Sequence, residues 1–164
     1  MAELVRLNGD IRAWEEGKPA FTSFAQAEVE TAVAMSTSKF DGVVFEMEHN
    51  FWDARALRDS MQYMLNRRAL VQGGTLAPTV TPMVRIPPNG GEHNQWLAKQ
   101  ALDLGVYGVL WPHISTVDQA RNAVSRNPVA QIKSHCRFEH GETDPDDRIR
   151  LQLVRDCKEH EENE

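Results

Sequence analysis

The sequence predicts an α/β protein built on a parallel β-sheet. Short runs of consecutive apolar and β-branched residues alternate along the chain with longer stretches that have helical periodicity, and this alternation occurs at least three times. Alternating strands and helices are typical of parallel sheets whose crossovers are helical. The length of 164 residues, with 41% hydrophobic residues, suits one globular domain with a sizeable core.

The strands are predicted from apolar runs that are bounded by turn residues. The clearest run is Gly42–Glu46, which is continuously apolar after Asp41 and fits a strand buried on both faces. Pro82 weakens one of the other candidates, because proline has no N–H to donate to a neighbouring strand. The four expected strands span residues 21–24, 42–46, 79–86 and 107–111.

The helices are predicted from apolar residues three and four positions apart. Gly17-Lys18-Pro19 ends the first helix, and Gly105 ends the fourth. Thr116 and Gln119 form a capping-box pattern at the start of the last helix. Residues 72–74 are expected to form a loop. The predicted helices span residues 3–16, 28–35, 52–66 and 92–104, with a fifth after Thr116.

Composition argues against several classes of protein. The formal net charge of −6 argues against a general nucleic-acid binder, which would carry a basic patch. No apolar run approaches the ~20 residues that span a bilayer, so no membrane partner is expected. The acidic start of the chain does not resemble a signal or transit peptide. Cys136 and Cys157 do not make a disulfide framework, which favours a reducing, cytoplasmic setting.

The chain changes character after Pro128, where charged residues become dense. We therefore expect an ordered part over residues 1–127 and a divergent, poorly ordered charged tail over residues 128–164. The tail also contains residue types that bind zinc. Their spacing, Cys-x3-His followed by Cys-x2-His, does not match familiar zinc modules; these residues are Cys136, His140, Cys157 and His160.

Ionisable residues follow successive predicted strands. Glu46, Glu48 and His49 follow one strand and Arg85 ends the next, while Trp111 and a further histidine follow a third. Because the carboxyl ends of parallel strands lie on one side of a sheet, we expect these groups to meet there. An arginine binds a carboxylate in a bidentate manner, and a histidine transfers protons near neutral pH. Each residue taken alone also fits a surface ion pair or a loop hydrogen bond.

Three motifs together resemble the HpcH/HpaI aldolase family over about residues 10 to 127. The resemblance implies a (β/α)₈ barrel of TIM type, of which this sequence contains about the first half. It also implies a carbon–carbon lyase that reversibly cleaves 4-hydroxy-2-oxo acids to pyruvate and an aldehyde. The motifs are Phe40-Asp41-Gly42-Val43-Val44-Phe45-Glu46-Met47-Glu48-His49, Pro82-Met83-Val84-Arg85-Ile86-Pro87, and Lys99-Gln100-Ala101-Leu102-Asp103-Leu104-Gly105 running into Gly108-Val109-Leu110-Trp111-Pro112.

The same resemblance assigns roles to individual residues. His49 resembles the catalytic base, Asp103 its acidic partner, and Arg85 the group that binds the pyruvate carboxylate and keto oxygen. Asp103 by itself would be interpreted as a solvent-facing residue at a helix end. We also expect Glu48 and Trp111 to contact the substrate, a small 2-oxo acid.

The family implies a divalent metal, Mg²⁺ or Mn²⁺, whose ligands are a Glu on a later strand and an Asp in a Gly-Pro-Ala-Asp-like turn. Neither motif is found in this sequence. A complete barrel needs about 250 residues. The sequence therefore predicts a truncated barrel that is inactive in isolation. The alternative is a non-catalytic protein that forms homo-oligomers or binds a partner through its open strand edges.

Overall fold

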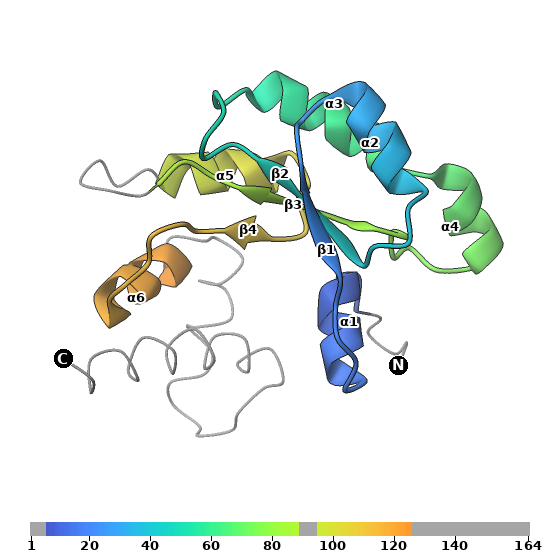
Figure 1. The fold of residues 1–164 in the computed structure, drawn as a ribbon, viewed down its shortest axis with the longest axis horizontal. Coiled ribbons are helices and arrows are strands. Elements are labelled where there is room, and N and C mark those ends of the chain that lie inside the picture. Colours follow the sequence, from blue (N-terminus) through green and yellow to red (C-terminus); the bar gives the residue numbers. More distant parts are fainter. Residues whose placement is uncertain (1–5, 89–94, 126–164) are drawn as a thin grey trace. The chain divides into compact units, whose positions relative to one another are not determined.

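The computed structural model describes residues 6–88 and 95–125, and these residues form an α/β fold with one four-stranded sheet (Figure 1). The strand order is β1-β2-β3-β4, which is also the order in the sequence, and all neighbouring strands are parallel. The strands are β1 (Thr22–Ala25), β2 (Gly42–Glu46), β3 (Thr81–Arg85) and β4 (Val109–Leu110). The helices are α1 (Gly9–Glu15), α2 (Val29–Ser36), α3 (Ala54–Met64), α4 (Arg67–Gly73), α5 (Gln95–Asp103) and α6 (Val117–Ser125).

The chain divides into two compact units, residues 1–112 and residues 113–164. The first unit contains the whole sheet and the first five helices. The described part of the second unit is residues 113–125, which contain α6. This helix begins with the predicted capping box: the Gln119 backbone N–H donates to Thr116 Oγ1 at 3.2 Å, and the Thr116 N–H donates to Gln119 Oε1 at 3.1 Å. In the described residues, no helix has the length and apolar character needed to cross a membrane.

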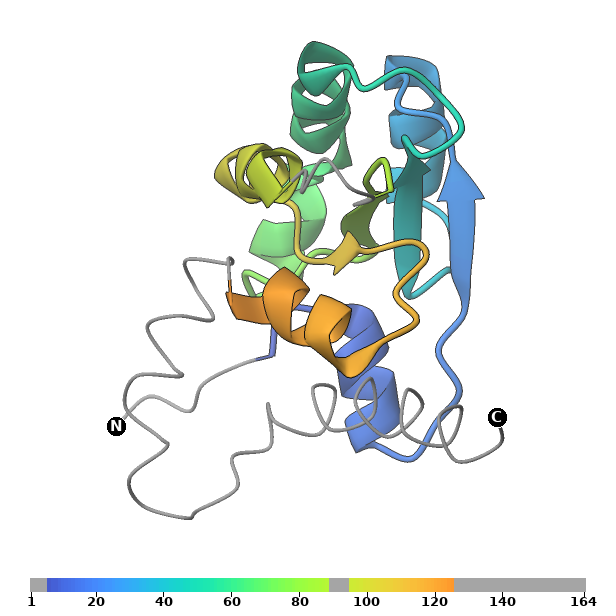
Figure 2. The ribbon, with the colours of Figure 1, turned by 90° about the vertical axis from the view of Figure 1, so that its left-hand side faces the viewer.

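The two faces of the sheet have different environments. Val43, Phe45 and Val84 are fully buried in a core that includes Leu57 and Met61 of α3 and Ala98 and Ala101 of α5. The helices α2 and α3 lie beside each other over this face (Figures 1 and 2). Because side chains alternate along a strand, the intervening residues point to the opposite face. That face carries Phe24, Val44, Glu46, Met83, Arg85 and Leu110.

The amino-terminal ends of the strands contact α1. Asn8 caps this helix by accepting hydrogen bonds from the backbone N–H groups of Asp10 and Ile11. The Gly9 N–H donates to Thr81 Oγ1 at 2.6 Å, and the Thr22 hydroxyl donates to Asp10 Oδ1 at 2.7 Å. The helix is therefore attached to both β1 and β3, with the Asp10 carboxylate buried between them.

Pro82 is accommodated inside β3 although this strand has neighbours on both sides. The N–H groups of Val84 and Ile86 donate toward β4, whereas the Thr81 N–H donates to Asp41 on the β2 side. By alternation, the nitrogen of Pro82 faces the β4 side, two residues before the first ladder partner at Val84. The position where proline lacks an N–H therefore faces a part of the chain that precedes β4, so no ladder hydrogen bond is lost. The carbonyl of Pro82 still accepts a hydrogen bond from the Tyr107 N–H at 2.9 Å.

The predicted α/β class, the parallel sheet and all four strands are confirmed. The strand Gly42–Glu46 has the predicted bounds. The first helix is shorter than expected, because Asn8 caps it. One helix, α4, was not predicted and replaces part of the expected loop at residues 72–74. The expected charged tail at 128–164, including its cysteines and the suggested zinc ligands, lies outside the described residues.

Candidate active site

The candidate site begins with a pair of residues at the carboxyl ends of two adjacent strands. Glu46 ends β2 and Arg85 ends β3, and the two are partners in the parallel register. Their side chains therefore lie on the same face, the one opposite the helices. Arg85 Nη2 forms a close ion pair with Glu46 Oε2. The sheet register itself thus produces this pair.

Glu46 also organises the loop that follows its strand. Its Oε1 accepts hydrogen bonds from the backbone N–H groups of Glu48 at 2.7 Å and His49 at 3.1 Å. Its carbonyl oxygen accepts from the side-chain amide of Asn50 at 3.1 Å. These contacts turn the chain back over the end of the sheet, so that a second carboxylate approaches Arg85.

That second carboxylate belongs to Glu48. Its Oε2 lies 2.9 Å from Arg85 Nη1, and its side chain is only 4% exposed. The same oxygen lies 3.6 Å from Nε2 of His49, whose side chain is 72% exposed. At that distance the contact is a charge interaction that strengthens when His49 is protonated, rather than a direct hydrogen bond. His49 is therefore open to solvent on one side and borders a carboxylate on the other.

Phe24 of β1 completes the surroundings of the arginine. Its ring centroid lies 4.7 Å from Cζ of Arg85, which is the geometry of a cation–π contact. The Nε atom of Arg85 is buried and makes no hydrogen bond in the described structure. The guanidinium is thus held by two carboxylates at its ends and by an aromatic ring on its face. Sequence reasoning did not identify Phe24, because the contact depends on the register between β1 and the other strands.

The surroundings of Glu46 favour its ionised form. Burial alone would raise the pKa of Glu46, but the hydrogen bond from Arg85 and the backbone N–H groups of His49 and Glu48 lower it. The net result is a pKa below the usual value.

Two other predicted site residues lie elsewhere in the chain. Asp103 is the exposed last residue of α5. The next residue, Leu104, lines a pocket with Thr79 and Pro82 at the start of β3, so Asp103 lies near the opposite end of the strands from His49. Trp111 packs against the hydrophobic core on the helix-covered side of the sheet. Contacts of these two residues with a substrate stay predictions.

The described residues do not fit the divalent metal that the family resemblance implies. Within residues 6–88 and 95–125, no group of three or more histidine, cysteine, aspartate or glutamate side chains is arranged to hold a metal ion. The two glutamates of the cluster are both engaged by Arg85. We therefore derive no chemical step through a metal from this part of the chain.

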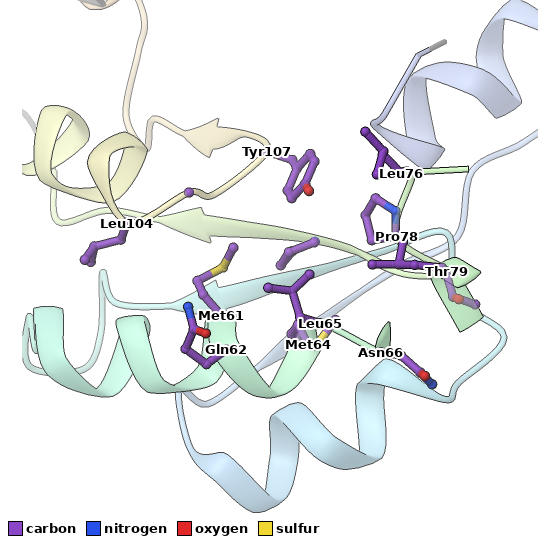
Figure 3. A pocket seen from close by; sticks show the side chains of 13 residues that line it. Met61, Gln62, Met64, Leu65, Asn66, Leu76, Pro78, Thr79, Leu104 and Tyr107 are labelled. Atoms are coloured by element: carbon purple, nitrogen blue, oxygen red, sulfur yellow. The ribbon is translucent and has the colours of Figure 1, made fainter. Parts of the chain in front are cut away.

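A separate pocket of about 240 Å³ lies toward the amino-terminal ends of the strands (Figure 3). Its lining is apolar or uncharged and includes Met61, Met64, Leu65, Leu104 and Tyr107. None of its lining residues is an acid, a histidine, a lysine or an arginine, and Tyr107 is the one titratable side chain among them. The arginine cluster is the better candidate for the reaction site.

Comparison with known proteins then identifies the family. Residues 21–144 match the model of the HpcH/HpaI aldolase/citrate lyase family, which is most of the chain and includes the whole arginine cluster. The chain belongs to the HpcH/HpaI aldolase/citrate lyase family. The match runs past residue 127, where the sequence motifs had placed the end of the resemblance.

Two curated relatives share the sequence of this HpcH/HpaI family member over most of its length. It is 30% identical over 119 residues to a hydroxypyruvate/pyruvate aldolase of Roseobacter denitrificans, covering 72% of this chain and 41% of the relative. It is 31% identical over 120 residues to a hydroxypyruvate/pyruvate aldolase of Paraburkholderia phytofirmans, covering 73% and 39%. The chain thus spans about two fifths of the length of these relatives.

Solved structures share the fold. A HpcH/HpaI aldolase/citrate lyase family protein from Burkholderia cenocepacia matches with a TM-score of 0.56 at 23% identity, covering 73% of this chain and 42% of that one. Macrophomate synthase matches with a TM-score of 0.52 at 20% identity, covering 73% and 37%. At these identities the similarity concerns the fold alone.

Proposed function

We propose that this chain supplies the oxo-acid-binding and proton-transferring part of a pyruvate-type aldolase. The reaction is the reversible cleavage of a 4-hydroxy-2-oxo acid to pyruvate and an aldehyde. The observation that carries the proposal is the cluster of Arg85, Glu48 and His49 at the carboxyl ends of the strands. It lies within the family match, and both curated relatives are named hydroxypyruvate/pyruvate aldolase.

Arg85 is suited to hold the acid and to stabilise the charge that develops during cleavage. When the bond between C3 and C4 breaks, its electron pair moves into the oxo acid and forms the enolate of pyruvate. The negative charge then lies on the former keto oxygen. A guanidinium in a partly buried site stabilises such an oxyanion more strongly than it stabilises the neutral ketone. Arg85, with a side chain 23% exposed, meets this condition.

His49 is the candidate base. In the cleavage direction it removes the proton from the C4 hydroxyl, the aldehyde leaves, and C3 of the enolate then takes up a proton to give pyruvate. Its exposed ring is accessible to a substrate, and Glu48 beside it stabilises the protonated imidazole. Asp103 keeps its proposed role as the acidic partner of the base. Asp103 lies near the opposite end of the strands from His49. It can therefore partner this base only if it comes from a second copy of the chain, or if the chain adopts a different conformation.

The first test is binding of pyruvate, measured by ligand-observed NMR. We expect the wild-type chain to bind pyruvate and Arg85→Gln to lose most of that binding. Arg58→Gln is the matched control, because Arg58 is an exposed arginine of α3 paired with its neighbour Asp59. Equal binding by the wild type and Arg85→Gln would exclude the arginine as the oxo-acid site.

A second candidate function is self-association through the sheet. Phe24 is 53% exposed and Leu110 is 44% exposed on the face that lacks helices, and β1 and β4 are edge strands in the described sheet. Exposed edges and apolar side chains favour pairing with another chain. Sedimentation equilibrium distinguishes the two candidates: a stable dimer that does not bind pyruvate supports this second function.

A further inference from the structure

Glu46 is the acid of the cluster to which the proposed reaction assigns no task. It ends β2, lies beside Arg85 in the register with β3, and its side chain is 13% exposed. Its two carboxylate oxygens have different partners. Oε2 forms the close ion pair with Arg85 Nη2, whereas Oε1 accepts from the backbone N–H groups of Glu48 and His49. One side chain therefore contacts both the candidate anion-binding group and the segment that carries the candidate base.

The contact with Arg85 restrains the direction of the guanidinium. A long side chain that is free in solution loses rotamer freedom when a ligand orders it, and this loss weakens binding. Arg85 is ordered already, because Glu46 holds its Nη2 and the Phe24 ring lies 4.7 Å from its Cζ. A guanidinium has five N–H donors, so the pair with Glu46 leaves others for a ligand.

The direction of the guanidinium matters more for a 2-oxo acid than for a simple carboxylate. The charge of Arg85 attracts any carboxylate, and this attraction depends on distance rather than on direction. Pyruvate bound as proposed must also bring its keto oxygen to an N–H donor. A site that hydrogen-bonds one particular substrate group discriminates against the analogue that lacks it. A guanidinium held in one direction thus favours pyruvate over propionate, which has the same charge and no keto oxygen.

The contact with the loop restrains the backbone beside the base. Residues 47–53 join β2 to α3 and form no helix or strand. Glu46 Oε1 holds two consecutive N–H groups of this loop at 2.7 and 3.1 Å, and the Glu46 carbonyl accepts from the Asn50 side chain at 3.1 Å. The His49 side chain is 72% exposed, so packing does little to hold it. Hydrogen bonds to Glu46 therefore fix the start of the loop.

We propose that Glu46 is a positioning residue of this site: through Oε2 it orients Arg85 so that the guanidinium selects 2-oxo acids over simple carboxylates, and through Oε1 it fixes the backbone that carries His49. This inference rests on the proposed function, in which Arg85 binds the oxo acid. Burial alone would raise the pKa of Glu46, but the hydrogen bonds from Arg85 and from the two N–H groups lower it. The carboxylate therefore stays ionised and accepts from both sides at once.

Two substitutions of Glu46 separate its two tasks. Glu46→Gln is isosteric and keeps an oxygen that accepts from the loop, but it has no charge to pair with Arg85. Glu46→Ala loses both contacts. Because the two variants change the charge equally, a difference between them reports the lost acceptor. Glu30→Gln, in which an exposed acid of α2 is replaced, is the control for net charge.

The first experiment is an NMR titration of the full chain with pyruvate and, separately, with propionate at pH 7. Loss of a negative charge beside Arg85 strengthens the binding of both anions, so the ratio of the two affinities is the deciding quantity. We expect the wild type and Glu30→Gln to prefer pyruvate, and Glu46→Gln to reduce this preference by roughly tenfold, as for the loss of one hydrogen bond to a charged group. The terminal N–H signals of Arg85 should be separate in the wild type and averaged by rotation in Glu46→Gln.

Hydrogen exchange of the Glu48 and His49 amides tests the second task. Exchange should be about tenfold faster in Glu46→Ala than in Glu46→Gln, because only the glutamine keeps the acceptor. Equal exchange in the two variants would overturn the role of Oε1. Glu46→Gln decides the role of Oε2 even if Glu46→Ala does not fold.

The outcomes separate this inference from the proposed function. Equal preference for pyruvate in the wild type and Glu46→Gln, with unchanged Arg85 signals, would overturn the orienting role of Glu46 and leave the oxo-acid site standing. A wild type that binds pyruvate no better than propionate would overturn the proposed function, and the selection by Glu46 with it.

Discussion

At the scale of single residues, Arg85 shows how the neighbours of one side chain set its chemistry. The two glutamates keep the guanidinium in place but also compete with any acidic ligand. Phe24 has a different effect, because its ring restrains the guanidinium plane without competing for the nitrogens. The affinity of the site for an anion thus depends on two kinds of contact: ion pairs, which compete with the anion, and the aromatic contact, which does not.

Replacing Phe24 should loosen Arg85. We expect Phe24→Leu to weaken pyruvate binding by about two- to fivefold, since an exposed cation–π contact contributes roughly 0.5–1 kcal/mol. Phe24→Tyr should retain most of the affinity, because it keeps the ring. The Nε–H resonance of Arg85 reports the contact directly, because stacking on an aromatic ring shifts that proton upfield and Phe24→Leu should abolish the shift.

Phe51 provides the matched control for this pair, because its side chain is 96% exposed. Phe51→Leu should leave the Arg85 resonance where it is in the wild type. An unchanged Arg85 resonance in Phe24→Leu would show that the ring does not hold the guanidinium.

Asp10 should make stability depend on pH. Burial is the main cause that raises its pKa above the ordinary 3.8; nearby Asp41 adds to this, while Thr22 and Arg12 oppose it. The folded protein therefore binds this proton more tightly than the unfolded chain does. Its contribution to the free energy of unfolding is greatest below pH 3.8 and is lost as pH rises through the raised pKa.

In Asp10→Asn, the free energy of unfolding does not fall with rising pH through this group, because an asparagine side chain does not ionise. We expect the free energy of unfolding of Asp10→Asn, relative to the wild type, to increase between pH 3.5 and pH 7, as measured by urea denaturation. Asp59→Asn, on the exposed side of α3, is the control for a general change in net charge. A constant difference between Asp10→Asn and the wild type over this range would contradict the expected protonation.

At the scale of the elements, Gly42 allows β2 and α1 to pack closely together. A Cβ atom at this position would collide with the Asp10 carboxylate and would lie 2.9 Å from Cε of Met83. We expect Gly42→Ala to lower the free energy of unfolding by roughly 1–3 kcal/mol, as overpacking in a core does. Gly73→Ala is the control, because the nearest atom to its Cβ would be 3.7 Å away on Thr75. It should be neutral or stabilising, and equal losses for both variants would exclude a specific clash.

Most of the sheet was predictable from the sequence because buried parallel strands are continuously apolar. The helix α4 was missed because its apolar residues do not show a clear face over so few positions. Asn66, which accepts from the Ala69 N–H, and Gly74, with φ of 63°, are the capping signals that would have indicated it. The position of Pro82 within β3 was unexpected from proline's chemistry alone. Whether a strand tolerates a proline at this position depends on where the neighbouring strand β4 begins.

The candidate site was predictable in part. The rule that the carboxyl ends of parallel strands meet placed Glu46, Glu48, His49 and Arg85 together, and the ion pairs show this grouping. The side of the sheet to which the Trp111 side chain points was not predictable, because it depends on the register at the end of β4. Asp103 was assigned by resemblance alone, and neither periodicity nor spacing indicates where it acts.

At the scale of the whole molecule, we expect residues 1–125 by themselves to show little or no aldol cleavage. The described residues contain no group of side chains arranged to hold a metal ion. A bound metal supplies several kcal/mol of charge stabilisation in the transition state. Each ~1.4 kcal/mol changes the rate tenfold. Fusing residues 1–125 to the remaining part of a family relative should restore activity. Pyruvate release, measured with Mg²⁺ or Mn²⁺, tests both proteins.

In that fusion, assayed in the direction of aldol addition, Arg85→Ala should raise the KM for pyruvate and lower kcat, because the same group holds the ground state and the enolate. Arg58→Ala should change neither. Rapid metal-dependent cleavage by the unfused chain would contradict the expected inactivity, and a fusion insensitive to Arg85→Ala would contradict the role of the arginine.

The strand order of the sheet has a consequence for how the protein is made. Because the order in space is the order in the sequence, each strand that leaves the ribosome meets an edge formed by the strand before it. Among the four described strands, none has to insert between two others that have already paired. The sheet can therefore grow during synthesis by addition at one edge, and the register of each new strand is chosen against a template that is already folded.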